Sequence, residues 1–286
     1  SLYFIVFIVQ IFLFKYILKI KLFWTIHNLY PHKHYHKSLE KYFSIKMIKL
    51  ADGVIAHSIS NKEQIINEFN ATKFSDKIFV IPHGHFINNY ANNISYEESR
   101  RAFNISVNDF VFLFFGRIEE YKGVLKLIDC FKKLQKEYYN IHLLIAGAVR
   151  NENLKQKIIE RTDNNGSIKI EFKSIGDDEI QNYMKCSNIV VIPYENIFTS
   201  GSAILAMSFS KPIIIPRFGG VREILSDESN FYYENNRDVE TGLYEQMKNA
   251  IIQKDRLVKM GSDNYEKIVA INWTYVANLT QKAYGK

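Results

Sequence analysis

Short apolar strands alternate with helical stretches along most of this 286-residue sequence, and this alternation constrains the fold more than any other feature. The run 111–115 has no polar member, as expected of a strand covered on both faces of a parallel sheet. Strands are predicted at 21–27, 53–57, 78–84, 110–116, 141–147, 167–172, 188–194 and 212–217, and helices between them at 38–50, 61–69, 123–137, 151–161, 177–186 and 201–210. The pattern predicts an α/β protein with two Rossmann-like, doubly wound domains.

A polar stretch at residues 87–107 divides the chain. It is typical of a linker followed by a short helix, which places the domain boundary there. We therefore expect a first domain with its linker at residues 1–107, and a second domain at 108–270 that ends in two helices. The tail, 271–286, is expected to form a helix that packs back on the first domain.

The N-terminal segment is almost purely apolar from Leu2 to Leu13. A membrane-spanning helix needs about 20 apolar residues, and Lys15 follows too early for that. The segment also lacks the basic start and small-residue cleavage site of a signal peptide. We expect a helix buried in a larger sheet assembly, with a membrane anchor as the alternative. Because the sequence begins with Ser1, it is interpreted as a fragment.

Charge and cysteine usage narrow the possible partners. The formal net charge of +7 favours anions such as nucleotides, phospholipid headgroups or nucleic acid. Lysines are scattered, without an arginine-rich stripe among aromatic residues, so nucleic acid is not expected as a partner. Cys130 and Cys186 lie far apart in helical patterns, which indicates small core residues and neither a disulfide framework nor a zinc site.

Two cations follow the buried strand at 110–116. Gly116 ends the strand, and Arg117 and Lys122 lie in the loop before the next helix. Ligands of open α/β sheets bind outside the carboxyl ends of strands, so this loop is aimed at a ligand site, and its charge favours an anion. The alternative is a solvated basic loop.

A second candidate anion site follows the strand at 188–194. The residues Thr199, Ser200, Gly201 and Ser202 come directly before a predicted helix. Free N–H groups and the helix dipole at such a start bind phosphate, and a glycine lets the backbone approach it closely. The alternative is an ordinary helix cap, but a doubly wound sheet can bring this segment beside the basic loop.

Each of the first three predicted strands ends near a histidine, namely His27, His57 and His83. Carboxyl ends of parallel strands meet at one edge of a sheet, so these side chains are expected to face a common crevice. Three further histidines alternate at residues 32, 34 and 36, but their Pro and Lys neighbours favour a solvated loop over a metal site.

In order, these motifs resemble the nucleotide-binding half of GT-B glycosyltransferases. The motifs are G-R-x4-K-G from Gly116, a strand ending in Gly147, "TSG" before "AMSFSKP", and "FGGVREIL". The elements "TIHN", "IPHG" and "NW" are similar to the retaining group 1 type, called family 4. The resemblance is specific over residues 110–225 and looser over 1–109. There the first domain is partial and the chain is interpreted as N-terminally incomplete.

The resemblance implies roles for particular residues. Arg117 and Lys122 match a basic pair that neutralises the diphosphate of a nucleotide sugar as it leaves, and His27 matches a histidine near the transferred sugar. Nucleotide-sugar binding is assigned to Gly116, Ser174, Ile175, Glu195, Thr199, Ser200, Gly201 and Ser202. No Asp-x-Asp pair is placed to hold a divalent cation at a strand end, so the resemblance implies a reaction without a metal or other cofactor.

The sequence departs from the family at two glutamates that usually flank this block. The second position is Leu205, and the first aligns with Ile197, with Glu195 and Asn196 just upstream. The family's contact to the nucleotide ribose is therefore lost or supplied elsewhere. The phosphate-binding segment must then carry more of the donor binding.

Taken together, the resemblance implies an enzyme that transfers a hexose from a UDP- or GDP-sugar to a saccharide or lipid-linked acceptor in polysaccharide biosynthesis. A cytoplasmic location is expected, with peripheral contact between the first domain and the inner face of the membrane. Two alternatives stay open. One is a nucleotide-sugar 2-epimerase of the same fold, and the other is a non-catalytic subunit that binds a nucleotide sugar.

Overall fold

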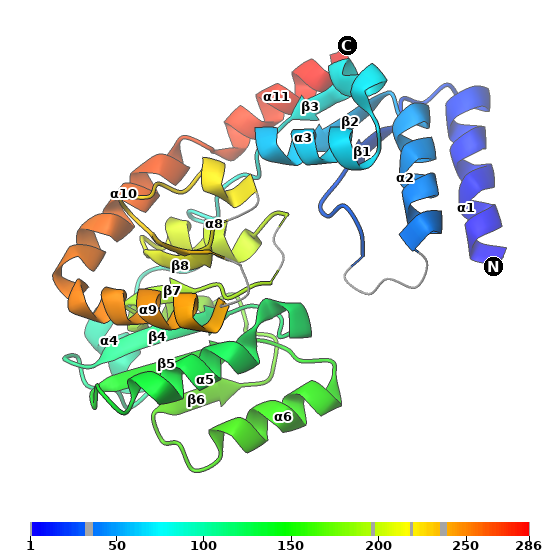
Figure 1. Cartoon of the computed structure of the whole chain (residues 1–286). Coiled ribbons are helices and arrows are strands. Elements are labelled where there is room, and N and C mark those ends of the chain that lie inside the picture. The colour runs from blue at the N-terminus through cyan, green and yellow to red at the C-terminus, as the bar shows by residue number, and fades with distance from the viewer. Residues whose placement is uncertain (1, 32–36, 196–197, 218–219, 235–238, 286) are drawn as a thin grey trace. The chain divides into compact units, whose positions relative to one another are not determined.

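The computed structural model describes residues 2–31, 37–195, 198–217, 220–234 and 239–285 (Figure 1). The chain forms two compact units. Unit 1 comprises Ser1–His83 and Thr274–Lys286, and unit 2 comprises Gly84–Trp273. Each unit has its own parallel sheet, so the predicted α/β class is confirmed.

Unit 1 is built on three parallel strands in the order β1-β2-β3, which are β1 (Phe23–Thr25), β2 (Gly53–Ala56) and β3 (Ile78–Val80). The helices α2 (Lys37–Leu50) and α3 (Ile59–Glu68) connect them. The C-terminal helix α11 (Trp273–Gly285) packs on this sheet, since Ala283 shares a buried cluster with Ile55 and Ile81. The Tyr284 ring also lies 4.4 Å from that of Phe23, centroid to centroid.

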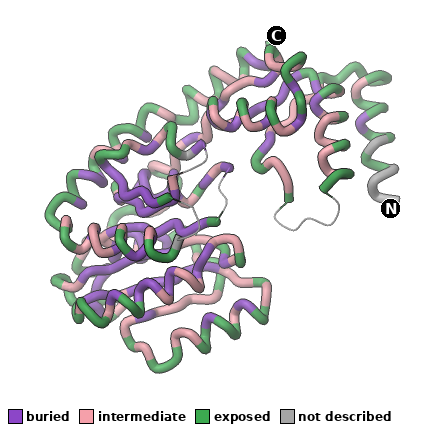
Figure 2. The backbone as a smooth tube through the Cα atoms, in the orientation of Figure 1, coloured by how far each residue is buried: buried purple, intermediate pink, exposed green. Residues whose placement is uncertain are grey.

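The N-terminal helix α1 (Leu2–Phe12) continues into a single π-helical turn, Leu13–Ile17. The prediction that it is buried is wrong for most of its described side chains. Phe12 is 56% exposed, and the part of the α1 tube that is not grey in Figure 2 is mostly coloured as exposed. The described sheet ends at β1, so it offers no further strand for α1 to cover. The ion pair near α1 comes from the π-helical turn that follows it, where Lys15 pairs with Asp52. No helix in the described parts of the chain is long and apolar enough to cross a membrane.

Unit 2 contains a six-stranded parallel sheet in the order β6-β5-β4-β7-β8-β9. The chain therefore winds outward from β4 in one direction and, after β6, returns to β7 and winds in the other. This is the doubly wound topology that the sequence predicts. The strands are β4 (Phe110–Phe115), β5 (Ile141–Ala146), β6 (Ile168–Glu171), β7 (Ile189–Val191), β8 (Ile213–Pro216) and β9 (Phe231–Tyr233).

Helices cover both faces of this sheet (Figure 1). On one face α5 packs against α6 and α9, while α4 packs against α7 and α8 against α10. Cys130 of α5 and Cys186 of α7 are both buried free thiols, as predicted. The helices are α4 (Tyr96–Ala102), α5 (Val124–Leu134), α6 (Glu152–Thr162), α7 (Ile180–Cys186), α8 (Gly201–Ser208), α9 (Val239–Ile252) and α10 (Leu257–Val269).

The segment 87–107, which the sequence assigned to a linker, lies within unit 2. Its helix α4 carries Arg100, which is 1% exposed. The Arg100 guanidinium donates to the carbonyls of Ser106 and Asp109 at 2.9 and 2.8 Å, and to Asn188 Oδ1 at 2.7 Å. Because burying an arginine without such acceptors would be costly, these bonds hold α4 onto the sheet. The compact units accordingly divide at residues 83 and 84.

Candidate functional site

The strands β4 and β7 are neighbours, and the chain leaves them in opposite directions. Such a switch point leaves a crevice outside the carboxyl ends of the two strands, where open α/β sheets bind ligands. The loop after β4 and the segment after β7 meet here. Glu195 N–H donates to Tyr121 O at 2.8 Å, and a Cβ added at Gly123 would lie 2.1 Å from Pro193 O.

Gly116, Lys122 and Ser202 converge at this edge of the sheet. Gly116 has a left-handed φ of 123°. A Cβ at this position would lie 3.1 Å from Ser202 Oγ and 3.7 Å from Lys122 Nζ. A side chain at residue 116 would therefore be strained and would crowd both groups. The prediction that the doubly wound order brings the basic loop beside the helix start of α8 is confirmed.

Ser202 ties the helix start to strand β4. Its hydroxyl donates to Phe115 O at 3.1 Å. The Tyr194 hydroxyl lies 3.2 Å from Ser202 Oγ and, because the serine proton is already donated, acts as the donor to it. Tyr194 is buried, and burial raises the pKa of its hydroxyl, so it stays protonated and can fill this role.

Lys122 carries its charge in a partly dehydrated position. Its ammonium lies 5.0 Å from the centre of the Tyr194 ring, a favourable cation–π distance. Burial lowers the pKa of Lys122 to about 8, with Glu119 opposing and Arg117 reinforcing the shift. Within the described residues, the side chains of Lys122 and of the exposed Arg117 make no hydrogen bond or ion pair, although the Lys122 backbone N–H donates to Glu119 O at 3.0 Å. An anion at this edge would supply a partner for these side chains.

The start of α8 is a capped helix start with an open glycine. Ser200 is the N-cap, with Oγ accepting from Ala203 N–H at 3.2 Å, and Thr199 precedes it half-buried. A Cβ added at Gly201 would meet no atom within 4 Å, and its backbone is not left-handed. Neither packing nor backbone conformation therefore requires a glycine at Gly201. A ligand held against the backbone would be a reason for one.

The remaining predicted nucleotide-binding residues lie farther from this convergence. Glu195 pairs with Lys126 of α5 at 2.6 Å. Ser174 and Ile175 follow β6, two strands away from β4 at the same edge of the sheet. Leu205 is 7% exposed and belongs to the core. Its hydrocarbon side chain offers no polar group to a ribose. The positions 196 and 197 lie outside the described residues.

The three strand-end histidines of unit 1 also meet, as predicted. His57 Nε2 lies 3.3 Å from His27 Nδ1, and His57 Nδ1 lies 3.0 Å from Ile81 O. The ring centres of His57 and His83 are 6.0 Å apart. The histidines at 32, 34 and 36 lie outside the described residues. Within the described parts of the chain, no three potential ligands are arranged to hold a metal ion.

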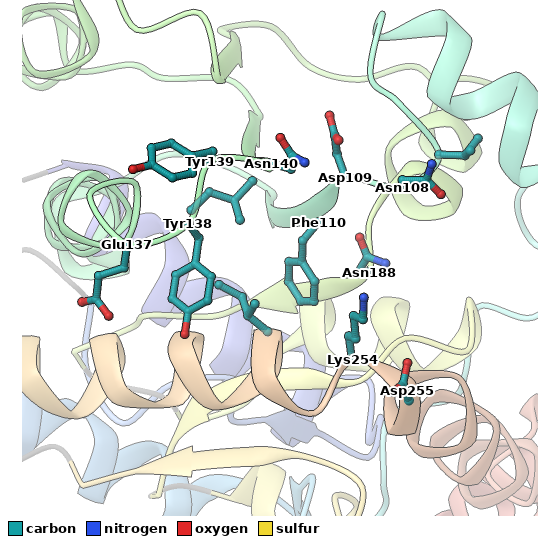
Figure 3. Close-up of a pocket in the computed structure, with 13 residues that line it drawn as sticks. Asn108, Asp109, Phe110, Glu137, Tyr138, Tyr139, Asn140, Asn188, Lys254 and Asp255 are labelled. Atoms are coloured by element: carbon teal, nitrogen blue, oxygen red, sulfur yellow. The ribbon is translucent and has the colours of Figure 1, made fainter.

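A cavity of about 610 Å³ lies at the opposite edge of the unit 2 sheet (Figure 3). It is lined where β4 and β5 begin, by Asp109, Phe110 and Asn140, and by Lys254 and Asp255 after α9. This cavity does not coincide with the predicted site, which lies at the carboxyl ends of the strands. It therefore contributes nothing to the assignment of Lys122 and its neighbours.

Sequence reasoning missed the part played by Tyr194, which both stacks on Lys122 and bonds Ser202. A signal was present, because Tyr194 follows Pro193 directly after a buried strand that points at the switch point. An aromatic residue at the end of that strand is expected to contact side chains of the loop that follows the neighbouring strand, β4. It also missed the link from His57 to the carbonyl of Ile81.

Comparison with known proteins agrees with this geometry. Residues 95–267, over half of the chain, match the family model described as glycosyl transferases group 1. The chain is 26% identical over 237 residues to an uncharacterised glycosyltransferase of Methanocaldococcus jannaschii, covering 81% of this chain and 59% of that protein. It is 25% identical over 187 residues to the lipopolysaccharide 1,2-N-acetylglucosaminetransferase of Salmonella typhimurium, covering 63% and 49%.

Among solved structures, HepE of Anabaena, in complex with UDP and glucose, superposes with a TM-score of 0.75 at 19% identity, covering 95% of this chain and 72% of that chain. At this identity the likeness shows the fold alone, which is GT-B. The chain spans about half to three fifths of the length of the two curated relatives. The family match, which includes the converging residues of unit 2, places this chain in the group 1 glycosyltransferases of the GT-B fold.

Proposed function

We propose that the protein transfers a hexosyl group from a nucleoside diphosphate sugar to a saccharide or lipid-linked acceptor. The observation that carries this proposal is the convergence of Lys122 Nζ, Gly116 and Ser202 at the switch point of unit 2. It combines a cation, a close backbone approach and a helix start, the three features that favour a diphosphate. Membership of the group 1 family supports the same conclusion.

Arg117 and Lys122 are the proposed stabilisers of the leaving group. When the bond between the sugar C1 and the diphosphate oxygen breaks, its electron pair stays on the diphosphate. Negative charge therefore grows there in the transition state, and fixed cations stabilise that state more than the bound substrate. Because this pair supplies the charge, we expect transfer without a metal ion.

The acceptor hydroxyl oxygen forms the new bond to C1. Its proton passes to the departing diphosphate oxygen or to His27, which we propose as a hydrogen-bonding partner of the sugar or acceptor. Retention of configuration follows from the family and stays a prediction. Ser200, Gly201 and the preceding Thr199 are the proposed phosphate ligands, with Glu195, Ser174 and Ile175 nearer the nucleoside.

Peripheral membrane contact through unit 1, at the inner face of the membrane, is part of the proposal. The exposed side chains Phe7 and Phe12 of α1 support it, together with the exposed Lys19 after them. Apolar groups beside cations suit the boundary between headgroups and acyl chains. Sedimentation with anionic vesicles tests this point, and a protein that stays in the supernatant would contradict it.

A second candidate is a subunit that binds a nucleotide sugar without catalysis. Leu205 favours it, because a core leucine stands where the family carries a glutamate. Thermal shift with a panel of UDP- and GDP-sugars, followed by incubation of the bound donor with and without saccharide acceptors, separates the two. Acceptor-dependent release of nucleoside diphosphate supports transfer, and binding without release supports the subunit. If no nucleotide shifts the melting temperature, both are wrong.

A further inference from the structure

The cavity where β4 and β5 begin, which the proposed function does not use, has a mostly apolar floor (Figure 3). The floor consists of Phe110, which is buried, and of Tyr138 and Ile251, which pack partly buried against the same core. The side chains of Phe110 and Tyr138 both extend toward α9 (Figure 3). The volume of about 610 Å³ lies within the range of pockets that bind small molecules, and such pockets combine an apolar lining with a few polar groups. The cavity therefore has the size and the lining of a ligand site.

Exposed polar side chains complete the lining. They form the rim, which consists of Asn108, Asn140, Lys254 and Asp255. Across the described ranges of the chain, none of these side chains makes a hydrogen bond or an ion pair. A carboxamide offers two donors and an acceptor, and a hydroxyl group also donates and accepts, so the two asparagines can bond hydroxyl groups in either direction. The rim is therefore suited to a ligand that carries several hydroxyl groups.

The charges of the lining disfavour an ionic ligand. The lining carries one ammonium group, that of Lys254, and three carboxylates, which belong to Asp109, Glu137 and Asp255. The excess of carboxylates disfavours a phosphate or another anion. Two of the carboxylates are already engaged, because Asp109 Oδ2 lies 2.8 Å from His142 Nε2 and Glu137 Oε2 pairs with Lys248 Nζ at 2.7 Å. The third is adjacent to Lys254 in the sequence. A cation would therefore find little unpaired negative charge, and a neutral polar ligand fits this lining best.

The walls of the cavity are held in place by hydrogen bonds of the protein itself. Phe110 N–H donates to Asn140 O at 2.8 Å. Asn188, which also lines the cavity, accepts at Oδ1 from Val111 N–H and from the Arg100 guanidinium, each at 2.7 Å. These bonds join main-chain groups and a buried arginine, so the cavity does not depend on a ligand for its shape. A ligand would therefore bind at a low cost in ordering the protein.

We propose that this cavity is a second saccharide-binding site, separate from the site of transfer. The apolar face of a neutral sugar ring would lie on Tyr138, and its hydroxyl groups would bond the amides of Asn108 and Asn140. The choice of a saccharide among neutral polar ligands rests on the proposed function, whose acceptor is a saccharide. Because the cavity and the candidate diphosphate site lie at opposite edges of one sheet, a sugar bound here does not react. It retains an acceptor chain on the enzyme and raises its local concentration.

The direct test places a neutral disaccharide in the cavity of the full chain. Methyl NMR of protein labelled with ¹³C at isoleucine methyl groups follows Ile251, whose signal is assigned by its loss in Ile251→Val. Maltose, cellobiose and N,N′-diacetylchitobiose are the probes. We expect at least one of them to shift the Ile251 signal in a saturable manner and to leave Ile159, an exposed residue of α6 outside the lining, unchanged. If no probe shifts Ile251, or if shifts occur only elsewhere, the proposal is overturned.

A variant of the rim tests the predicted contact. Asn140→Ala removes the side-chain amide and keeps the carbonyl that accepts from Phe110 N–H, so the fold should persist. The affinity for the disaccharide that shifts Ile251 should fall by about tenfold, the equivalent of one lost hydrogen bond. Asn92→Ala, at an exposed asparagine before α4 that does not line the cavity, is the matched control and should bind as the unaltered chain does. Equal affinities in both variants would overturn the assignment of the rim.

The same protein separates this inference from the proposed function. A chain that shows the Ile251 shift, but whose melting temperature responds to no nucleotide, would retain the saccharide site and overturn the diphosphate site. A chain that binds UDP and transfers sugar without any shift at Ile251 would support the proposed function and overturn the second site. Addition of UDP should leave the affinity of the cavity for the disaccharide unchanged, because the two sites lie at opposite edges of the sheet. Displacement of the disaccharide from Ile251 by UDP would show that the cavity is not a separate saccharide site.

Discussion

The two sheets place their candidate functional residues by the same rule but give them opposite electrostatic character. In unit 2 the carboxyl edge carries Arg117 and Lys122, with the small residues Gly116 and Gly201 beside them. In unit 1 the corresponding edge carries histidines, and burial keeps His57 neutral near pH 7. The parallel topology thus decides where a site forms, and the side chains decide whether it stabilises charge or directs hydrogen bonds.

The two edges differ in whether the surroundings of their basic side chains favour a positive charge. Lys122 is held over the Tyr194 ring, without a described carboxylate in ion-pair contact, so an arriving anion would find an unneutralised cation. His57 instead satisfies Ile81 O and faces two other histidines, an arrangement that disfavours a positive charge. This contrast is the reason that we propose the diphosphate site in unit 2 and contacts to neutral hydroxyl groups in unit 1.

The largest expected effect follows from removing a positive charge at the carboxyl edge of the unit 2 sheet. Arg117→Ala and Lys122→Ala should each lower the rate of transfer by about a hundredfold, or about 3 kcal/mol in the barrier, since each removes a stabiliser of the leaving group. Steady-state kinetics at saturating donor measures this effect. Lys157→Ala, an exposed lysine on α6, is the matched control and should leave the rate unchanged. Near-normal turnover in either edge variant would remove that residue from the leaving-group role.

The next effect concerns the phosphate ligands. Gly201→Val should weaken binding of UDP by at least about tenfold, because the new side chain enters the space that we assign to the phosphates. The fold should persist, since nothing in the described residues lies within 4 Å of the added Cβ. Gly166→Val is the control, because Gly166 has equally open space in the loop before β6. Calorimetry that finds equal affinities for both variants would place the phosphates elsewhere.

A smaller effect comes from pH. Lys122 has its pKa lowered to about 8, and a bound anion should raise it again. Below pH 8 the lysine is protonated whether or not UDP is bound, so affinity should be level. Above pH 8 affinity should fall, by up to about tenfold per pH unit, since binding then requires proton uptake. Calorimetry from about pH 7 to about pH 9 in buffers of different ionisation enthalpy measures both quantities.

The matched variant for this pH effect is Lys122→Arg, which keeps the charge at every pH in that range. Its affinity profile should be level. If the unaltered chain and the arginine variant have the same profile, the titration does not belong to Lys122. His57 should not contribute to this window, because its pKa is lowered and its titration lies on the acid side.

The sequence predicted what depends on local pattern. It gave the strand ending at Phe115, the glycine after it and the cap of α8, because apolar runs, glycine and small hydroxyl residues act over a few positions. It did not predict β9, since three aromatic residues at Phe231–Tyr233 are too short a run to show a period. Pairing with β8 stabilises that strand.

Polar contacts between residues far apart in the chain could not be predicted from the sequence pattern either. Arg100 is buried because Asn188, which is 88 positions away, accepts from it, and no local pattern announces such a partner. The exposure of α1 was missed for a related reason, because a helix that is apolar all round does not show which neighbours the chain supplies. The role of Tyr194 likewise depends on Lys122 and Ser202 from other elements.

The smallest expected effect tests whether Tyr194 and Ser202 act as one hydrogen-bonded unit. Ser202→Ala removes the acceptor of the Tyr194 hydroxyl and the donor to Phe115 O, and should lower the free energy of unfolding of unit 2 by about 1 kcal/mol. Tyr194→Phe should cost a similar amount. Once Ser202 is already replaced, the tyrosine change should cost little, because its partner is gone. Urea unfolding of the two single variants and the double variant measures this coupling. Costs that simply add would show that the two hydroxyl groups do not depend on each other.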